Sequence, residues 1–163
     1  MPIAEELKQS RPFPAKSQEA AVALMRTADL VRRAVAAVIE PRGITTQQYN
    51  VLRILRGAGE RGLPTLEIAE RMIEQTPGIT RLIDRLESKR LVSRERCTTD
   101  RRQVFCRIRS EGLELLETLD KPLAESEQEA LGSMGQQDLL QLVELLDRAR
   151  TGLSAALLAP RTN

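Results

Sequence analysis

The segment TPGITRLIDRLESK, residues 76–89, decides the fold. Its apolar residues recur at i, i+3, i+4 and i+7, the spacing of one buried stripe on an amphipathic helix. Thr76 is predicted to cap this helix, and Pro77 to occupy its first position, where the missing N–H group costs nothing. The apolar stripe is Ile79, Leu82, Ile83 and Leu86, and the polar face is Gly78, Thr80, Arg81, Asp84, Arg85, Ser88 and Lys89.

The segments on either side of this helix extend the pattern. Upstream, a short helix is predicted to turn its apolar side chains inward before a turn at Glu74–Gln75. Downstream, residues 91–97 and 103–108 are predicted to form two short strands around a polar tip. Helix, turn, helix and basic hairpin in this order are typical of a winged helix-turn-helix module. The inward residues of the short helix are Leu66, Ile68, Ala69, Met72 and Ile73.

The chain outside this module is predicted to be mainly long helices. Residues 1–16 form a loose arm, and Ser17 caps a helix that ends at Pro41 and Gly43. Thr45 or Thr46 caps the next helix, and residues 61–64 make a turn. Two further helices follow from Ser110 onward, separated by a break at residues 132–135, and Pro122 predicts a kink.

The predicted fold class is mainly α with a small β-hairpin wing. We expect one domain over residues 1–163, in which residues 44–109 form the winged helix-turn-helix module. Residues 17–40 and 110–158 carry more aliphatic surface than so small a module can cover. We therefore expect these helices to dimerise with a second copy about a two-fold axis. A monomeric helical bundle with a winged appendage is the alternative.

The composition excludes several classes of protein. With no histidine, the chain lacks the commonest general base and the commonest metal ligand, and two cysteines cannot complete a four-cysteine zinc site. No paired carboxylates, phosphate loop or activated nucleophile is present, so we expect neither an enzyme nor a cofactor. No apolar run is long enough to cross a membrane, and a cytoplasmic location is expected.

Charge is distributed unevenly, although the whole chain carries only +2. Residues 71–109 hold eleven basic and five acidic residues, a net charge of +6, whereas residues 110–150 carry −7. A basic block beside an acidic block indicates a polyanion-binding face on one side of the molecule. Two solvated surfaces are the alternative interpretation.

The polar face of the central helix supplies candidate DNA contacts. Thr76 and Gly78 lie at the start of the helix, where Gly78 permits close backbone approach, and Thr80 suits a thymine methyl or a phosphate. Arg81 is the candidate for bidentate contact with guanine, whereas Arg85 and Lys89 suit phosphates. Asp84 is expected to orient a neighbouring arginine. An ordinary solvated helix face is the alternative.

The hairpin supplies a second set of candidates. A tip centred between Arg101 and Arg102 would place Arg94 opposite Arg109 and Arg96 opposite Arg107. Like charges directly opposite one another are unfavourable unless water, acids or a phosphate backbone neutralise them. Asp100 would fix the adjacent Arg101 and Arg102, so that one of these arginines can enter a narrow minor groove. A solvated hairpin whose charges prevent edge pairing is the alternative.

The two cysteines fall in the predicted strands. In the register above, Cys97 and Cys106 are cross-strand neighbours. One interpretation is an oxidation switch, with Arg96 and Arg107 lowering a thiol pKa. The other, which we favour, is two small apolar residues in a sheet.

Four motifs together resemble the MarR (multiple antibiotic resistance regulator) family: LEIAERM at 66–72, ITRLIDRLE at 79–87, LVSR at 91–94 and DRR at 100–102. The resemblance covers residues 44–112 by motif and the rest by helix order. Cys106 departs from the family's strand, which is usually richer in Val and Leu.

The resemblance implies a homodimer that binds a pseudo-palindromic double-stranded DNA operator, usually as a repressor relieved by a small ligand or an oxidant. It implies dimerisation through the first, fifth and sixth helices. It also implies a pocket for the effector, an unidentified small molecule, between the dimerisation helices and the reading module, near Tyr49, Arg53 and the facing side of the first helix. A redox-responsive regulator acting through Cys97 and Cys106, and a non-specific architectural DNA-binding protein, remain the alternatives.

Overall fold

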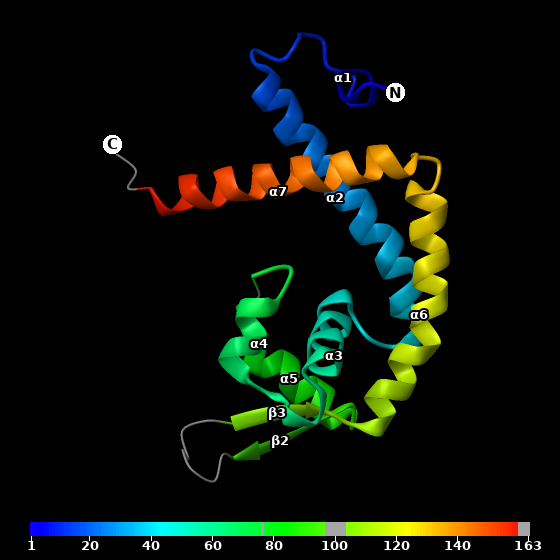
Figure 1. Ribbon diagram of the computed structural model, residues 1–163, viewed down its shortest axis with the longest axis vertical. Coiled ribbons are helices and arrows are strands. Elements are labelled where there is room, and N and C mark those ends of the chain that lie inside the picture. Colours follow the sequence, from blue (N-terminus) through cyan, green and yellow to red (C-terminus); the bar gives the residue numbers. More distant parts are fainter. Residues whose placement is uncertain (76, 97–103, 160–163) are drawn as a thin grey trace. The chain divides into compact units, whose positions relative to one another are not determined.

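The computed structural model describes residues 1–75, 77–96 and 104–159 (Figure 1). The chain divides into two units, Met1–Leu123 and Ala124–Asn163. In chain order the elements are α1 (Ile3–Glu6), α2 (Lys16–Ile39), η1 (Glu40–Arg42), α3 (Thr46–Ala58), η2 (Gly59–Arg61), β1 (Leu63–Pro64), α4 (Thr65–Arg71), α5 (Ile79–Ser88), β2 (Val92–Arg96), β3 (Val104–Ile108), α6 (Ser110–Leu131) and α7 (Gln136–Leu158).

The N-terminal arm is more ordered than predicted. Residues 3–6 form α1, and Arg26 Nε of α2 donates to Glu6 Oε1 at 2.6 Å. The predicted cap at Ser17 is wrong, because Ala15 is the last extended residue and the helix begins at Lys16. The predicted end of the helix is confirmed, since α2 stops at Ile39 and Gly43 adopts a left-handed φ of 77°.

The start of α3 follows its predicted capping chemistry. Gln48 N donates to Thr45 Oγ1 at 3.2 Å, and Thr45 N donates to Gln48 Oε1 at 3.1 Å. This reciprocal pair is a capping box, which satisfies two backbone donors that the helix itself leaves free. Tyr49, Leu52 and Leu55 are buried, as their spacing predicts.

Helix α5 confirms the apolar stripe but not the predicted start. Leu82, Ile83 and Leu86 are buried, and Ile79 packs partly against the same core. The placement of Pro77 at the first helical position is wrong, because α5 begins at Ile79. Gly78 has a φ of 92°, a left-handed conformation that keeps the residues before it out of the helix. The predicted cap, Thr76, lies outside the described residues.

Helix α4 is shorter than its apolar pattern suggests. Ile68 is buried as predicted, but Leu66 and Ile73 are 77% and 87% exposed, so their inward placement is wrong. The helix ends at Arg71 and Met72 is extended, which takes Ile73 off the helix. The Ile73 backbone N–H instead donates to Asn50 Oδ1 of α3 at 2.9 Å.

The sheet has a third strand in the part of the chain that the structure describes. Its order is β1–β3–β2, with antiparallel neighbours. Residues 63–64, predicted as part of a turn, form β1, in which Leu63 pairs with Cys106. Without β1, the hairpin would have only its own two strands to hold it. With β1, β3 becomes the central strand.

The predicted hairpin register is also wrong. Arg94 pairs with Cys106 and Arg96 with Val104, not with Arg109 and Arg107. The observed register pairs the buried Val92 with Ile108 and keeps the four arginines from facing one another. An odd shift in register exchanges the two faces of a strand, so burial of apolar side chains decides between the alternatives.

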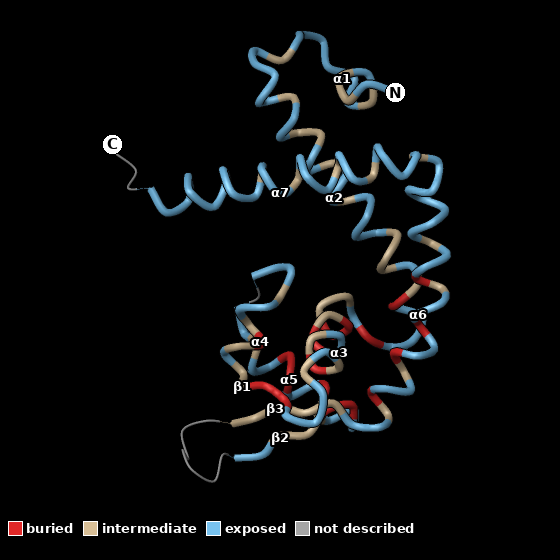
Figure 2. The backbone as a smooth tube through the Cα atoms, viewed as in Figure 1, coloured by how far each residue is buried: buried red, intermediate tan, exposed pale blue. Residues whose placement is uncertain are grey.

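The core of the first unit lies between α3, α5, β3 and the first part of α6 (Figure 2). Leu116, Leu119 and Leu123 of α6 are buried in it. Asp120, on an outer face of the same helix, accepts from both terminal nitrogens of Arg56 at 2.8 and 3.0 Å. Helix α6 is therefore fastened to α3 by both packing and charge.

The predicted break at residues 132–135 is confirmed, since α6 ends at Leu131 and α7 begins at Gln136. Pro122 lies inside α6, and a kink there stays a prediction. Helix α7 buries none of its residues. Among the described residues, no helix is both long enough and apolar enough to span a membrane.

Candidate nucleic-acid interface

Helix α5 presents an exposed polar face that is free to meet a ligand. Gly78, Thr80, Arg81 and Arg85 are all exposed. Within the described chain, the side chains of Arg81 and Arg85 form no hydrogen bond or ion pair. Three of α5's side chains in the core fix the helix rotation, so these two guanidinium groups point away from the hydrophobic core.

Other predicted contact residues are held by the protein itself. Lys89 Nζ donates to the Gly43 carbonyl oxygen, which ties the end of α5 to the turn before α3. Arg94 is engaged with Asp84 and Glu87, whereas Arg96, at the end of β2, is exposed and has no partner among the described residues. The remaining predicted contacts, Thr76, Asp100, Arg101 and Arg102, lie outside the described residues.

Asp84 orients an arginine, as predicted, but the partner comes from the wing. Arg94 Nη2 lies 2.6 Å from Asp84 Oδ1 and 2.5 Å from Glu87 Oε2, and Arg94 Nε donates to the same Glu87 oxygen at 2.9 Å. The hydrogen bond to Glu87, followed by that to Asp84, raises the pKa of Arg94, opposed by partial burial. Helix α5 and strand β2 are thus joined by one cation shared between two carboxylates.

Two further arginines near the wing have roles that the sequence analysis did not assign. Arg107 donates to the Glu60 carbonyl at 2.8 Å and pairs with Glu95, so β3 is tied both to η2 and to β2. Arg90 follows α5 with a φ of 60°, the left-handed conformation that usually falls to glycine. Because no glycine follows α5 before Leu91, the sequence lacks the residue that usually marks such a position.

Cys106 does not have the surroundings predicted for a redox switch. Its cross-strand partners are Leu63 in β1 and Arg94 in β2, so the predicted pairing with Cys97, which lies outside the described residues, is wrong. The Cys106 side chain is fully buried, with Thr65 Oγ1 3.7 Å from its Sγ. Burial raises the thiol pKa, contrary to the lowering expected from nearby arginines, and a higher pKa leaves less reactive thiolate.

The predicted effector region centres on α3. Tyr49 is buried, Arg53 is exposed, and Arg53 Nη1 donates to the Tyr49 hydroxyl at 3.4 Å. The Arg53 guanidinium carbon lies 5.9 Å from the centre of the Tyr49 ring. The pair offers an aromatic ring and a hydroxyl beside a cation.

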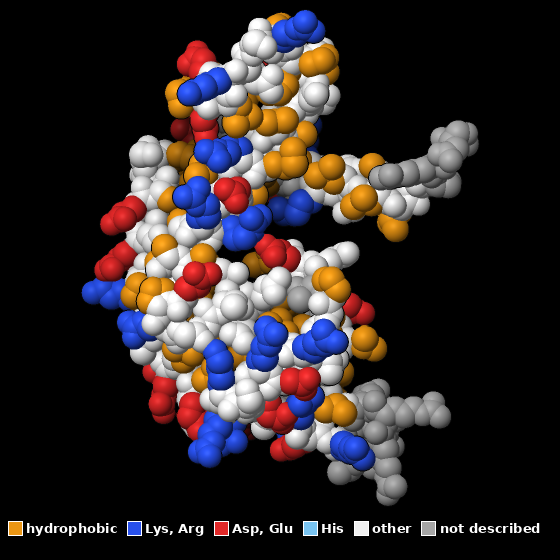
Figure 3. Space-filling model, turned by 180° about the vertical axis from the view of Figure 1, so that it is seen from behind, with side chains coloured by type: hydrophobic (Ala, Val, Ile, Leu, Met, Phe, Trp, Pro, Cys, Tyr) orange, Lys and Arg blue, Asp and Glu red, His pale blue; other side chains and the backbone are white. Residues whose placement is uncertain are grey.

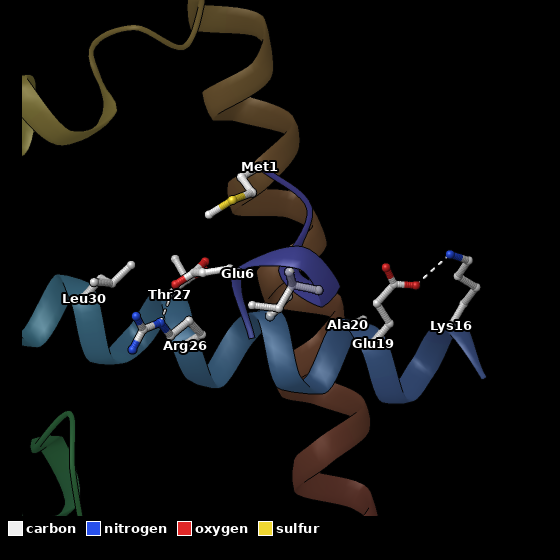
Figure 4. Close-up of a pocket in the computed structure, with 10 residues that line it drawn as sticks. Met1, Glu6, Lys16, Glu19, Ala20, Arg26, Thr27 and Leu30 are labelled. Atoms are coloured by element: carbon white, nitrogen blue, oxygen red, sulfur yellow. Dashed lines mark hydrogen bonds and ion pairs between the residues drawn. The ribbon is translucent and has the colours of Figure 1, made fainter. Parts of the chain in front are cut away.

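A separate cavity of about 470 Å³ lies between α1 and α2, and neither Tyr49 nor Arg53 lines it (Figure 4). Its lining is mixed: apolar side chains such as Ile3 and Leu30 alternate with the ion pairs Glu6–Arg26 and Glu19–Lys16. In the described chain, no cluster of three or more His, Cys, Asp or Glu side chains could hold a metal ion.

The two helices α4 and α5, the sheet that follows them and the exposed arginines of α5 define a winged helix-turn-helix DNA-binding protein. The MarR family model matches residues 44–104, which include these elements up to the start of β3. A MarR transcription factor from Planctomyces limnophilus, known as a crystal structure, is 36% identical, with 83% of this chain and 98% of that chain covered and a TM-score of 0.64. This chain belongs to the MarR family and is a DNA-binding transcriptional regulator, not an enzyme.

Two other solved structures share the fold at lower identity. The MarR family regulator Sco3205 from Streptomyces coelicolor, in complex with DNA, is 22% identical with a TM-score of 0.76, covering 89% of this chain and 93% of its own. The PcaV regulator from the same organism, in complex with its natural ligand, is 22% identical with a TM-score of 0.69, covering 87% and 96%.

Proposed function

We propose that this protein is a homodimeric repressor that binds a pseudo-palindromic operator and is released from it by a small ligand. The observation that carries the proposal is the exposed face of α5, where Arg81 and Arg85 have no partner among the described residues. Unpaired arginines suit DNA, because they need not break an existing ion pair before they contact a base or a phosphate.

Sequence reading falls to the beginning of α5. Gly78 has no side chain to hinder approach, and Thr80 and Arg81 follow in the first turn of the helix. Arg81 contacts a guanine edge, and Arg85, one turn later, contacts phosphate. Arg96 and the wing tip, with Asp100, Arg101 and Arg102, follow the flanking backbone or minor groove.

Dimerisation falls to the terminal helices, residues 17–40 and 110–158, within a single domain of residues 1–163. Helix α7 carries hydrophobic side chains on its surface (Figure 3) and buries none of them. Helix α2 likewise exposes Leu24, Met25, Leu30 and Val31. Apolar surface on two long helices indicates a partner surface, and a second copy would also give two reading helices for two half-sites.

Effector binding falls to the region of Tyr49 and Arg53. The exposed Arg53 cation beside a buried phenol would suit an anionic or aromatic small molecule. The likeness of the fold to PcaV, solved with its natural ligand, supports a ligand-responsive regulator. A ligand bound there would change the DNA affinity if it binds more tightly to one of two conformations of the protein than to the other.

The test is selection from a random duplex pool with the purified protein, followed by anisotropy titration of the enriched sequences. The proposal predicts an inverted repeat whose half-sites lie about one helical turn apart. The same probe then reports effectors by their release of DNA. Binding without any enriched motif would replace the proposal with a non-specific architectural role, and an absence of binding would overturn it.

A further inference from the structure

The ion-pair cluster of Asp84, Glu87 and Arg94 joins the reading helix to the wing. Arg94 is the middle residue of β2, and its side chain is only 28% exposed, compared with 49% for Asp84 and 39% for Glu87. Its guanidinium group makes the three close contacts described above. Since Arg94 lies beside the fully buried Cys106 in the sheet, the cluster closes over the edge of the core.

The position of Asp84 gives this cluster a functional consequence. Three residues rotate a helix by about 300°, which is about 60° short of a full turn, so the exposed Asp84 lies on the same face as Arg81. An uncompensated carboxylate on that face would repel the phosphates of a bound duplex. Arg94 shares its single positive charge between Asp84 and Glu87, so its loss would take the net charge of the three side chains from −1 to −2.

We propose that Arg94 is a positioning residue that acts on DNA affinity through Asp84 and Glu87 and does not itself contact the duplex. The ion-pair cluster of Asp84, Glu87 and Arg94, here called the clasp, fixes the direction of β2 relative to α5. Arg81 and the wing can then reach DNA together. Arg94 also offsets one of the two negative charges that Asp84 and Glu87 place beside the reading face. This inference rests on the proposed function and concerns the same interface.

Two properties of the cluster support this role over a direct phosphate contact. First, Nε and Nη2 of Arg94 already form charge-assisted hydrogen bonds with acidic side chains, and a phosphate at these nitrogens would have to displace them. Second, the guanidinium spans α5 and β2, a link between elements that a lysine's single ammonium could not reproduce with the same geometry.

The experiment measures the effect of R94A in two backgrounds, the natural chain and a D84N/E87Q double variant. Anisotropy titrations on the selected duplex run over a range of salt concentrations. The clasp predicts that R94A weakens binding in the natural chain but that its effect is at least about threefold smaller in the double variant, a coupling within the range for one ion-pair network. A direct contact predicts the same loss in both backgrounds, with a salt slope lowered by about 0.9.

Arg96→Ala provides the matched control. Arg96 lies two residues further along β2, on the same face of the strand as Arg94, and has no ion-pair partner among the described residues. Its removal should therefore have the same effect in both backgrounds. Circular dichroism and thermal unfolding check that each variant folds, and R94Q replaces R94A if the latter does not.

The outcomes separate the two levels of the proposal. Equal losses on R94A in both backgrounds, or no loss in either, overturn the clasp while the DNA-binding function stands. Failure of the natural chain to bind any duplex overturns the proposed function and the clasp with it.

Discussion

Gly62 should tolerate a side chain poorly, because it combines a left-handed backbone with a close approach to β3, the central strand of the sheet. Its φ is 64° and its ψ −172°, a region that is essentially restricted to glycine. A Cβ atom added there would overlap the Cys106 backbone carbonyl and would lie 2.6 Å from Cγ of Arg107. The arginine side chain can move away, but the carbonyl belongs to the β3 backbone.

Gly59 is the matched control for this substitution. Its φ of 62° and ψ of −153° nearly repeat those of Gly62, yet a Cβ at Gly59 would meet no atom within 4 Å. Gly59→Ala should therefore cost only the backbone strain, roughly 1–3 kcal/mol of unfolding free energy. Gly62→Ala adds an overlap of the kind that costs a further ~1–3 kcal/mol.

The assay is urea denaturation followed by circular dichroism, with both variants compared with the natural chain. Gly62→Ala should lose clearly more unfolding free energy than Gly59→Ala. It should also weaken DNA binding, since β1 pairs with the strand that leads from the wing. Equal losses for the two variants would refute the close approach of Gly62 to β3, and with it the anchoring role of β1.

Four further predictions concern individual residues. Arg81→Ala should weaken binding to the selected duplex by roughly 1–3 kcal/mol and to random duplex by less, as measured by anisotropy; equal losses would remove its base-reading role. Arg90→Gly should raise the unfolding free energy by roughly 0.5–1 kcal/mol in urea denaturation, because the φ of 60° suits glycine, and destabilisation would contradict this. Hydrogen bonding to Arg56 lowers the pKa of Asp120, so the stability that the pair contributes is present above the ordinary carboxyl pKa of about 4 and is lost as the pH falls through the lower folded value. Because Asp120 is largely exposed, Asp120→Asn should cost at most about 1 kcal/mol at neutral pH, and that difference should shrink below pH about 4 in denaturation curves; a pH-independent difference would exclude the ion pair as its cause. In a C97S variant, Cys106 should react with a thiol reagent far more slowly in the folded than in the unfolded protein, and equal rates would revive the redox interpretation.

The sequence predictions that the structure confirms depend on interactions between residues close together in the chain. The stripe of α5 was predictable because helical periodicity and burial coincide at Leu82, Ile83 and Leu86. The start of α3 was predictable because the cap and its partner, Thr45 and Gln48, lie three residues apart. The order of helices, together with the family's motifs, then sufficed for the winged helix-turn-helix class.

The predictions that failed depend on contacts between distant segments. Leu63 and Pro64 form a strand only because β3 provides a partner more than forty residues later, and two residues carry no periodicity of their own. The observed hairpin register buries Val92 opposite Ile108. The predicted register was based only on an assumed tip between Arg101 and Arg102 and took no account of this burial. Pro77 is a common first residue of a helix, but the left-handed Gly78 after it delays the helix to Ile79.

In the candidate site, too, features set by local sequence were predictable and features set by contacts between elements were not. The exposure of Arg81 and Arg85 follows directly from the helix pattern, whereas the engagement of Arg94 and Lys89 does not. Both partners of Arg94, Asp84 and Glu87, precede it by no more than ten residues, but the sequence does not specify how β2 leaves α5. Only the three-dimensional arrangement distinguishes an arginine available to DNA from one already paired.

The most direct test of the central claim is the stoichiometry and affinity of the protein on the selected duplex, compared with a duplex in which one half-site is scrambled. Sedimentation velocity gives the number of chains bound, and anisotropy gives the dissociation constant. The account predicts two chains on the intact duplex and a marked loss of affinity when one half-site is scrambled. A single chain bound with the same affinity to both duplexes would contradict a dimer that reads two half-sites.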